Sequence, residues 1–410
     1  MTTNKFQHNR NRKSRVVTAA LAWGLAIVPA MIATPPAAAQ TFKLLYAFTG
    51  GADGGGPWGT PLLSGGDIYC TAFYGGGPSS GQAGTVFELI QITPPVGYPI
   101  YAFGSQPNDG AAPMGGLISD GMGDFYGTTT QGGFTQHGTI YVISQGTESV
   151  VVPFNGSNGA TPEGSLIMDP LGNIYGTTSQ GGANDSGTVF AFNGGLVELH
   201  SFGNSAGDGV GPASGLALQV ATSNGSPYIA LYGTTTEGGA HGWGTVFSVN
   251  TKTRAETVLF SFGGGPGGGT PVGGLALDGK GNIYGTTSAG GSANGTAGNG
   301  VVFKMSIKAP HQYSLVHTFT GPDGSQPLAA LLPDGKGNFY GTTYAGGAHG
   351  YGTVFELNSA GALTTLYSFT NGTDGSYPYA GLALDSSGNL YGAATGGGQY
   401  GWGTIFEIVP

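Results

Sequence analysis

A short acidic frame recurs along the chain and supplies the residues best suited to chemistry. It reads Asp, Gly, two further residues and Pro, and its acidic positions are Asp53, Asp109, Asp208, Asp323 and Asp374. One further copy has Asn158 and another has Gly267 at that position. Carboxylates bind calcium, but the ion takes six to eight oxygen ligands, which one Asp per repeat around a ring cannot supply. Because Asp-Gly also forms turns, we weigh a structural turn against a weak calcium or sugar-hydroxyl site.

The residue directly after each proline varies. In chain order these residues are Trp58, Met114, Glu163, Ala213, Val272, Leu328 and Tyr379. A fixed frame with one variable position is typical of a binding rim, although seven drifted copies of a turn would look the same. We predict that Trp58, Met114, Glu163, Leu328 and Tyr379 contribute to a ligand-binding site.

A second set of polar and aromatic residues lies in another connection of the repeat. Its members are His241, Trp243, His349, Tyr351 and Trp402. Aromatic rings on such loops can stack on sugar rings, so we add these residues to the candidate ligand-binding set. His137, His241 and His349 occupy equivalent positions, but they belong to repeats two, four and six. A shared zinc site is therefore disfavoured against solvated loop side chains.

Motifs for known catalytic chemistry are missing or out of context. The sequence has no His-Glu-x-x-His and no phosphate-binding loop, and Gly-x-Ser-x-Gly occurs only at residues 77–81 and 203–207, in glycine-rich turns rather than between a strand and a helix as a nucleophile elbow requires. A glycosidase or lyase needs paired carboxylates or a base beside them, and Glu163 and Glu237 are isolated in the sequence. We nominate no catalytic residue and no cofactor beyond the weak calcium site.

The elements that position these residues come from a repeat built on Tyr-Gly-Thr-Thr. Its tyrosines are Tyr69, Tyr126, Tyr175, Tyr232, Tyr284, Tyr340 and Tyr391, and a Gly-Gly pair follows each. Each repeat has about 50 residues and four strand-like runs, which we name a, b, c and d from the axis outward. These dimensions predict an all-β, seven-bladed β-propeller with four-stranded blades. The candidate residues then lie in the d–a and b–c connections, on one face.

The phase of the repeat favours a closed ring. Residues 42–48 form a d strand alone, and the sequence reaches Pro410 just after a c strand. We expect the N-terminal outer strand to complete the C-terminal blade, which removes open sheet edges. A β-solenoid with capping ends is the alternative, but it would not require this split.

Large apolar residues recur once per repeat and should form the core between blades. They are Phe48, Phe103, Phe154, Phe202, Phe262, Phe319 and Phe369 on d strands, Phe87, Tyr141, Phe190, Phe247, Phe303, Phe355 and Phe406 on c strands, and the seven b-strand tyrosines. Cys70 is the only cysteine, so no intramolecular disulfide forms, and we expect a small buried residue.

Residues 1–39 resemble a secretory signal peptide. Five basic residues precede an apolar stretch over residues 16–33, and Ala37, Ala38 and Ala39 form a cleavage site. A retained membrane anchor is the alternative. Cleavage would leave one propeller domain over residues 40–410, expected to be an exported monomer with no membrane span.

Charge separates the faces of that domain. Residues 40–410 contain 7 basic and 21 acidic residues, a formal charge of −14, so nucleic acid is a poor partner. The basic residues fall on c or d strands or in a–b and c–d turns, and none lies in a d–a or b–c connection. One face should therefore be acidic, aromatic and free of Lys and Arg, which favours neutral or cationic ligands.

The repeated Tyr-Gly-Thr-Thr, Gly-Gly and Gly-Thr-Val-Phe pattern resembles the choice-of-anchor tandem-repeat proteins that carry the Gloeobacter/Verrucomicrobia (GloVer) repeat. The resemblance covers residues 42–410. It implies an exported bacterial surface or extracellular protein of unknown molecular function, and it supplies no catalytic residues. Family members often end in an anchoring tail, whereas this sequence ends at Ile408, Val409 and Pro410. That favours a secreted or periplasmic protein.

Three classes of function remain open. The first is a non-enzymatic extracellular module that binds a glycan or a protein on the face of the d–a and b–c connections. The second is a polysaccharide-acting lyase or hydrolase with its site at the channel mouth, and the third is a structural matrix component.

Overall fold

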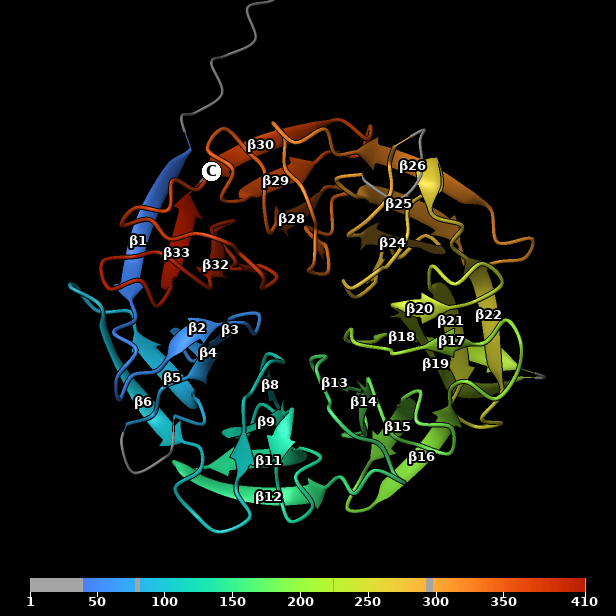
Figure 1. Cartoon of the computed structure of the whole chain (residues 1–410), viewed down its shortest axis with the longest axis horizontal. Coiled ribbons are helices and arrows are strands. Elements are labelled where there is room, and N and C mark those ends of the chain that lie inside the picture. The colour runs from blue at the N-terminus through green and yellow to red at the C-terminus, as the bar shows by residue number, and fades with distance from the viewer. Residues whose placement is uncertain (1–39, 78–81, 224, 293–297, 410) are drawn as a thin grey trace, which may run out of the picture. The chain divides into compact units, whose positions relative to one another are not determined.

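The structure, a computed structural model, describes residues 40–77, 82–223, 225–292 and 298–409. The predicted signal peptide, residues 1–39, lies outside the described residues. Seven small antiparallel sheets surround a central axis and form the predicted seven-bladed propeller (Figure 1). Among the described residues the only helical segment is the 3-10 turn Gly265–Gly267, and none of these residues forms a helix able to cross a bilayer.

Each blade has four main strands, and in every blade except blade 4 the inner strand is shorter than the outer one. They are β3 (Leu62–Ser64), β4 (Asp67–Tyr74), β5 (Thr85–Ile90) and β6 (Val96–Ala102) in blade 1; β8 (Ile118–Ser119), β9 (Asp124–Thr129), β11 (Thr139–Ser144) and β12 (Thr147–Pro153) in blade 2; β13 (Ile167–Met168), β14 (Ile174–Thr178), β15 (Thr188–Phe192) and β16 (Leu196–Ser201) in blade 3; β18 (Ala217–Ser223), β19 (Ser226–Thr235), β21 (Thr245–Asn250) and β22 (Glu256–Ser261) in blade 4; β23 (Ala276–Leu277), β24 (Asn282–Thr287), β25 (Val301–Ser306) and β26 (Tyr313–Thr318) in blade 5; β27 (Leu332–Pro333), β28 (Phe339–Thr343), β29 (Thr353–Leu357) and β30 (Leu363–Ser368) in blade 6; and β31 (Ala383–Leu384), β32 (Leu390–Ala394), β33 (Thr404–Val409) and β1 (Thr41–Ala47) in blade 7.

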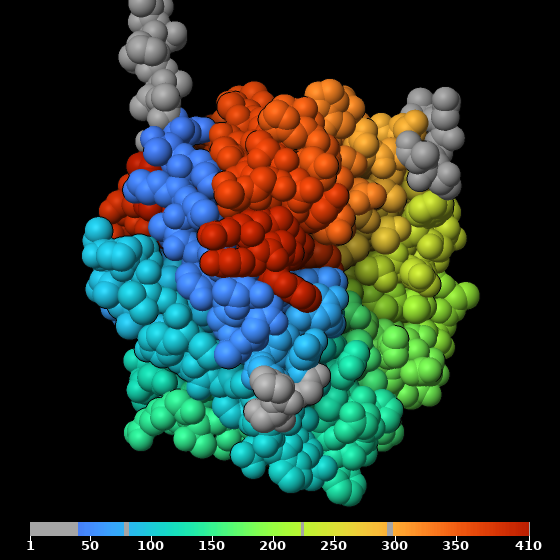
Figure 2. Space-filling model, turned by 60° about the vertical axis from the view of Figure 1, so that its left-hand side comes forward, coloured from blue at the N-terminus to red at the C-terminus, as the bar shows by residue number. Residues whose placement is uncertain are grey.

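Blade 7 closes the ring with strands from both ends of the described chain. β1 pairs antiparallel with β33, with Thr41 opposite Val409 and Lys43 opposite Glu407. The ammonium group of Lys43 lies 3.1 Å from the Glu407 carboxylate. Figure 2 shows the first described residues, in blue, lying against residues near the end of the described chain, in red. The predicted closure is confirmed.

The Tyr-Gly-Thr-Thr motif is explained by packing and hydrogen bonds within this ring. A Cβ on Gly285 would lie 2.5 Å from the ring of Phe303, so glycine leaves room for the c-strand aromatic residue. The next residue, Thr286, donates a hydrogen bond to the carbonyl of Ala329 in the following blade. The second threonine bonds across to the c strand, as Thr343 does with Thr353 at 2.8 Å. The motif therefore ties b strands to c strands and blades to their neighbours.

The core consists of the predicted phenylalanines. All seven d-strand residues and all seven c-strand aromatic residues are buried, as is Cys70, which replaces the motif glycine beneath Phe87 in blade 1. The b-strand tyrosines pack against this core as well, and Tyr175, Tyr232 and Tyr391 are buried in it. The other four are half-buried, namely Tyr69, Tyr126, Tyr284 and Tyr340. A phenol keeps its hydroxyl near water or a polar partner, as Tyr69 does with Glu88 at 2.5 Å.

Small pairings hold the d–a connection of each blade against the b–c connection of the same blade. Three of them involve short strands, namely β2 (Gly55–Pro57) with β4, β7 (Gly110–Ala111) with β10 (Gln131–Gly132), and β17 (Gly209–Val210) with β20 (Glu237–Gly238). The other four are single bridges, such as Gly269 with Ala289 and Ser376 with Gly396. These pairings build one face, which we call the loop face.

Candidate functional site

The acidic frame is occupied by the protein's own donors. Asp53 accepts hydrogen bonds from the Tyr46 hydroxyl at 3.0 Å and from the Thr49 amide at 2.8 Å. Asp374 does the same with the Tyr367 hydroxyl and the Thr370 amide. These carboxylates therefore fold the turn that leads to each proline. Calcium binding by Asp53, Asp109, Asp208, Asp323 or Asp374 stays a prediction.

The residue before each proline has an unusual backbone. Five non-glycine residues there have positive φ: Ala112 (58°), Thr161 (54°), Thr270 (52°), Gln326 (56°) and Tyr377 (58°). This conformation is uncommon for residues with a side chain. A hydrogen bond to the preceding blade holds it, such as Thr270 N–H to the Trp243 carbonyl at 2.9 Å. The neighbouring blade thus holds a strained backbone before the proline in these five repeats. This fixed turn directs the variable residue after the proline toward the axis of the ring.

The seven variable residues after proline converge at the centre of the ring. All of them line one cavity of about 370 Å³ at the centre of the ring, together with small residues of the inner strands. Trp58, Met114, Glu163, Leu328 and Tyr379 are each half-buried, so they reach both the wall and the solvent. Among the described lining residues Glu163 is the only carboxylate, and there is no Lys, Arg or His.

Glu163 and Tyr379 are the titratable groups of this lining. Burial raises the pKa of Glu163, and a hydrogen bond from the Ser179 hydroxyl at 2.9 Å opposes that shift. Burial, helped by the negative charge of Glu163, raises the pKa of Tyr379 to about 12. Tyr379 therefore stays protonated at neutral pH and can donate a hydrogen bond to a ligand.

A run of aromatic rings extends over the loop face of blades 1, 7 and 6 and includes two residues of the cavity lining, Trp58 and Tyr379. Its consecutive ring-centroid distances are 6.1 Å for Trp402–Tyr74, 4.7 Å for Tyr74–Phe73, 5.1 Å for Phe73–Trp58, 4.7 Å for Trp58–Tyr379, 6.5 Å for Tyr379–Tyr344, 5.0 Å for Tyr344–Tyr377 and 5.7 Å for Tyr377–Tyr351. We call these eight residues the aromatic run. The predicted residues Trp58, Tyr351, Tyr379 and Trp402 all belong to it.

The other four members, Phe73, Tyr74, Tyr344 and Tyr377, were missed in the sequence. Phe73 and Tyr344 occupy the fourth position after the motif tyrosine, where the other five repeats have Ser or Thr. There the hydroxyl bonds to the turn before proline, as Ser288 does with the Thr270 carbonyl at 2.8 Å. An aromatic residue at a position that otherwise carries this hydroxyl is the sequence feature that could have identified Phe73 and Tyr344.

The remaining predicted residues lie outside the cavity lining. Trp243 is half-buried and packs over Gly264 and Gly269 of the next blade, so it stabilises a junction between blades. His241 and His349 are exposed at loop tips. Neither belongs to a group of closely spaced metal-binding side chains among the described residues.

Comparison with solved structures supports the fold. Oligogalacturonate lyase from Vibrio parahaemolyticus superposes with a TM-score of 0.52 at 10% identity, over 90% of this chain and 93% of that one. The extracellular domain of a hybrid two component system from B. thetaiotaomicron gives 0.51 at 12% identity, over 91% of this chain and 42% of that one. At such identities the likeness concerns the fold alone. A comparison with curated proteins gives no match.

The Gloeobacter/Verrucomicrobia repeat model matches residues 32–230 and 292–410, which is well over half of the chain. The unmatched residues between these segments include Tyr232 and Tyr284, which occupy the same b-strand position as the other motif tyrosines. The chain belongs to the Gloeobacter/Verrucomicrobia repeat family.

Proposed function

We propose that this chain is an exported, non-enzymatic module that binds a glycan at the mouth of the central cavity. The observation that carries the proposal is the continuity of the aromatic run with the cavity. Trp58 and Tyr379 line the cavity, and their ring centroids lie 4.7 Å apart. Further aromatic rings of the run extend from both residues. Aromatic rings offer flat apolar surface together with a polar edge, which suits the faces and hydroxyl groups of sugars.

The charge of the site favours a neutral glycan. Glu163 is the only charged residue of the described lining, and the basic residues lie elsewhere. Those in strands are Lys43 in β1 and Lys304 in β25, and the others lie in a–b or c–d turns. A uronic-acid polymer would bring carboxylates to a site that has no cation to pair with them, which disfavours its binding.

The second candidate function is hydrolysis or elimination on a polysaccharide, because Glu163 and Tyr379 lie close enough to influence each other. Glycoside hydrolysis commonly uses two carboxylates. The described lining contains one, and the raised pKa of Tyr379 makes it a poor base at neutral pH. The geometry therefore supports binding better than catalysis.

The test is isothermal titration of the purified protein with neutral cello-, xylo- and manno-oligosaccharides and with oligogalacturonate. We expect heat of binding with a neutral oligosaccharide, lost in Trp58→Ala and kept in Val272→Ala, which changes the aromatic-free side of the same cavity. No binding to any neutral sugar, or equal binding by Trp58→Ala, would overturn the proposal. Release of shorter products would establish the catalytic alternative.

A further inference from the structure

The seven junctions between adjacent outer strands repeat one arrangement of three positions. The first lies near the end of a d strand, the second is the acidic position of the following d–a connection, and the third lies near the start of the next blade's d strand. The junction of blades 3 and 4, which we call the 3/4 junction, has His200, Asp208 and Glu256 at these positions. The junction of blades 5 and 6, the 5/6 junction, has His317, Asp323 and Leu363.

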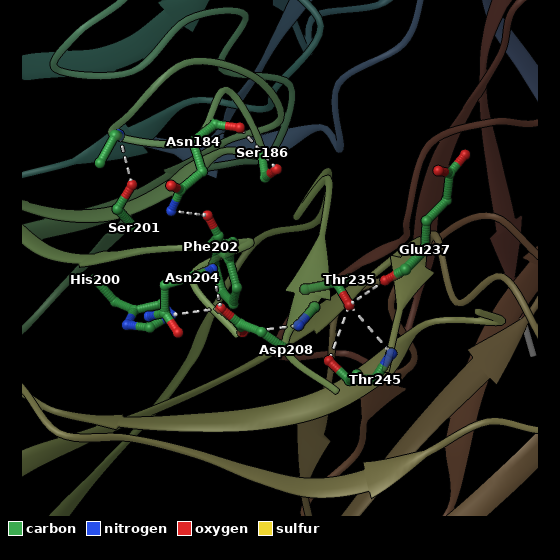
Figure 3. A network of polar contacts seen from close by, with 12 residues as sticks. Asn184, Ser186, His200, Ser201, Phe202, Asn204, Asp208, Thr235, Glu237 and Thr245 are labelled. Carbon is green, nitrogen blue, oxygen red and sulfur yellow. Dashed lines mark hydrogen bonds and ion pairs between the residues drawn. The ribbon is translucent and has the colours of Figure 1, made fainter. Parts of the chain in front are cut away.

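In the 3/4 junction three potential metal ligands converge. One side-chain ligand atom from each of His200, Asp208 and Glu256 lies within 4.8 Å of the other two. His200 Nε2 lies 3.7 Å from Asp208 Oδ2, too far for a hydrogen bond (Figure 3). His200 Nε2 and Glu256 Oε1 are both buried, and neither has a hydrogen-bond partner among the described residues. The side chain of Asp208 is 3% exposed, and the amides of Asn204 and Gly209 hold it in place.

The 5/6 junction shows what the same histidine and aspartate do without the glutamate. There His317 Nε2 lies 2.7 Å from Asp323 Oδ2 and makes a direct hydrogen bond. Leu363 stands where Glu256 stands. In the junction that has the second carboxylate, the distance between the histidine Nε2 and the aspartate Oδ2 is thus about an ångström longer. That distance is close to the one between two ligand atoms on one small ion.

Electrostatics adds to the need for a cation. Among the described residues no Lys or Arg side chain forms an ion pair with Asp208 or Glu256.

We propose that His200, Asp208 and Glu256 form a zinc site that joins the outer strands of blades 3 and 4. Zinc binds imidazole nitrogen and carboxylate oxygen at about 2.0–2.2 Å, which places tetrahedral ligands roughly 3.4 Å apart. The 3.7 Å between His200 and Asp208 needs little adjustment for this geometry. Calcium and magnesium prefer oxygen ligands alone, so the imidazole selects against them. Three protein ligands leave one position for water.

The test is zinc titration of the purified, chelator-treated protein without a polyhistidine tag, followed by calorimetry and by melting temperature. We expect one zinc per chain and a rise in melting temperature with zinc but not with calcium. Cobalt should give the visible absorption of a tetrahedral ion. Glu256→Leu copies the 5/6 junction and should lose at least ~tenfold in zinc affinity, because removing a ligand costs more than removing an outer partner.

Two matched variants keep the test decisive. His200→Tyr copies the junction of blades 1 and 2, where Tyr101 lies beside Asp109, and it should also lose zinc. His317→Tyr makes the same change in the 5/6 junction and should keep zinc binding unchanged. Melting without metal checks that each variant folds. Absence of zinc binding by the natural sequence, or zinc binding that survives both Glu256→Leu and His200→Tyr, would overturn the proposal.

Discussion

Two sides of the central cavity differ although the same repeated frame builds both. On one side Trp58 and Tyr379 belong to the aromatic run, whereas on the other Ala213 and Val272 present small aliphatic groups. The backbone of the two sides matches, because an inter-blade hydrogen bond holds each turn before proline. The comparison shows that the repeated residues stabilise the propeller, whereas one variable residue per blade determines the chemistry of the central cavity.

Removing a repeated core residue should destabilise the whole propeller, and with it both sides of the central cavity. We expect Phe303→Ala to lower the free energy of unfolding by about 3–5 kcal/mol, since the ring is fully buried between blades. Urea unfolding measures the loss. Val272→Ala, at a variable position, is the control and should change stability by less than about 1.5 kcal/mol. Equal losses in the two variants would contradict the division between repeated and variable positions.

The first threonine of the Tyr-Gly-Thr-Thr motif allows the contribution of a single inter-blade hydrogen bond to be tested. Thr286 donates to the Ala329 carbonyl, whereas the buried hydroxyl of Thr128, at the same motif position, has no hydrogen-bond partner in the part of the chain that the structure describes. Thr286→Val should therefore cost about 1–2 kcal/mol in stability, because it leaves that carbonyl without its donor. Thr128→Val should be neutral or stabilising in the same unfolding measurement. A larger loss in Thr128→Val would argue against this inter-blade bond.

Making the aromatic side resemble the aliphatic side should affect binding and leave the fold intact. Tyr379→Val gives blade 7 the residue of blade 5, and we expect about a tenfold loss of glycan affinity, or roughly 1.4 kcal/mol. Calorimetric titration with the oligosaccharide bound by the natural protein measures it. Val272→Ala changes an aliphatic residue of the same lining and should retain affinity. A similar loss in both variants would assign binding to the cavity shape rather than to the aromatic ring.

The smallest expected effect concerns a junction rather than the cavity. Burial, with the nearby charge of Asp109, raises the pKa of Glu148 to about 7 from its ordinary 4.5. The folded state therefore holds this proton more tightly, and the resulting stability, present below the unfolded pKa, is lost as the pH rises through the folded pKa. Glu148→Gln should raise stability by about 1 kcal/mol at about pH 8 and have a smaller effect at about pH 5. Melting temperatures at the two pH values check this, and an equal difference at both would contradict it.

Much of the fold and part of the site follow from the sequence. The period of the repeat and its phase predicted the seven blades and the β1–β33 pairing, and the proline frame identified the one variable position of each repeat that lines the cavity. The rest depends on contacts between blades, which no single repeat contains. The link from Phe73 through Trp58 to Tyr379 joins two blades, and Glu256 approaches His200 and Asp208 only when outer strands pack side by side.

The pairing of β1 with β33 also orders events during synthesis. The Lys43–Glu407 contact joins residues 364 positions apart. β1 can therefore pair with β33 only when most of the described chain is present. Blades 1 to 6 draw each of their main strands from one continuous stretch and can form as those strands emerge. Closing a loop of this length is slow relative to local pairing. β1 therefore lacks its blade 7 partner until the residues of β33 are present, which makes closure of the ring depend on the most distant pairing among the described residues.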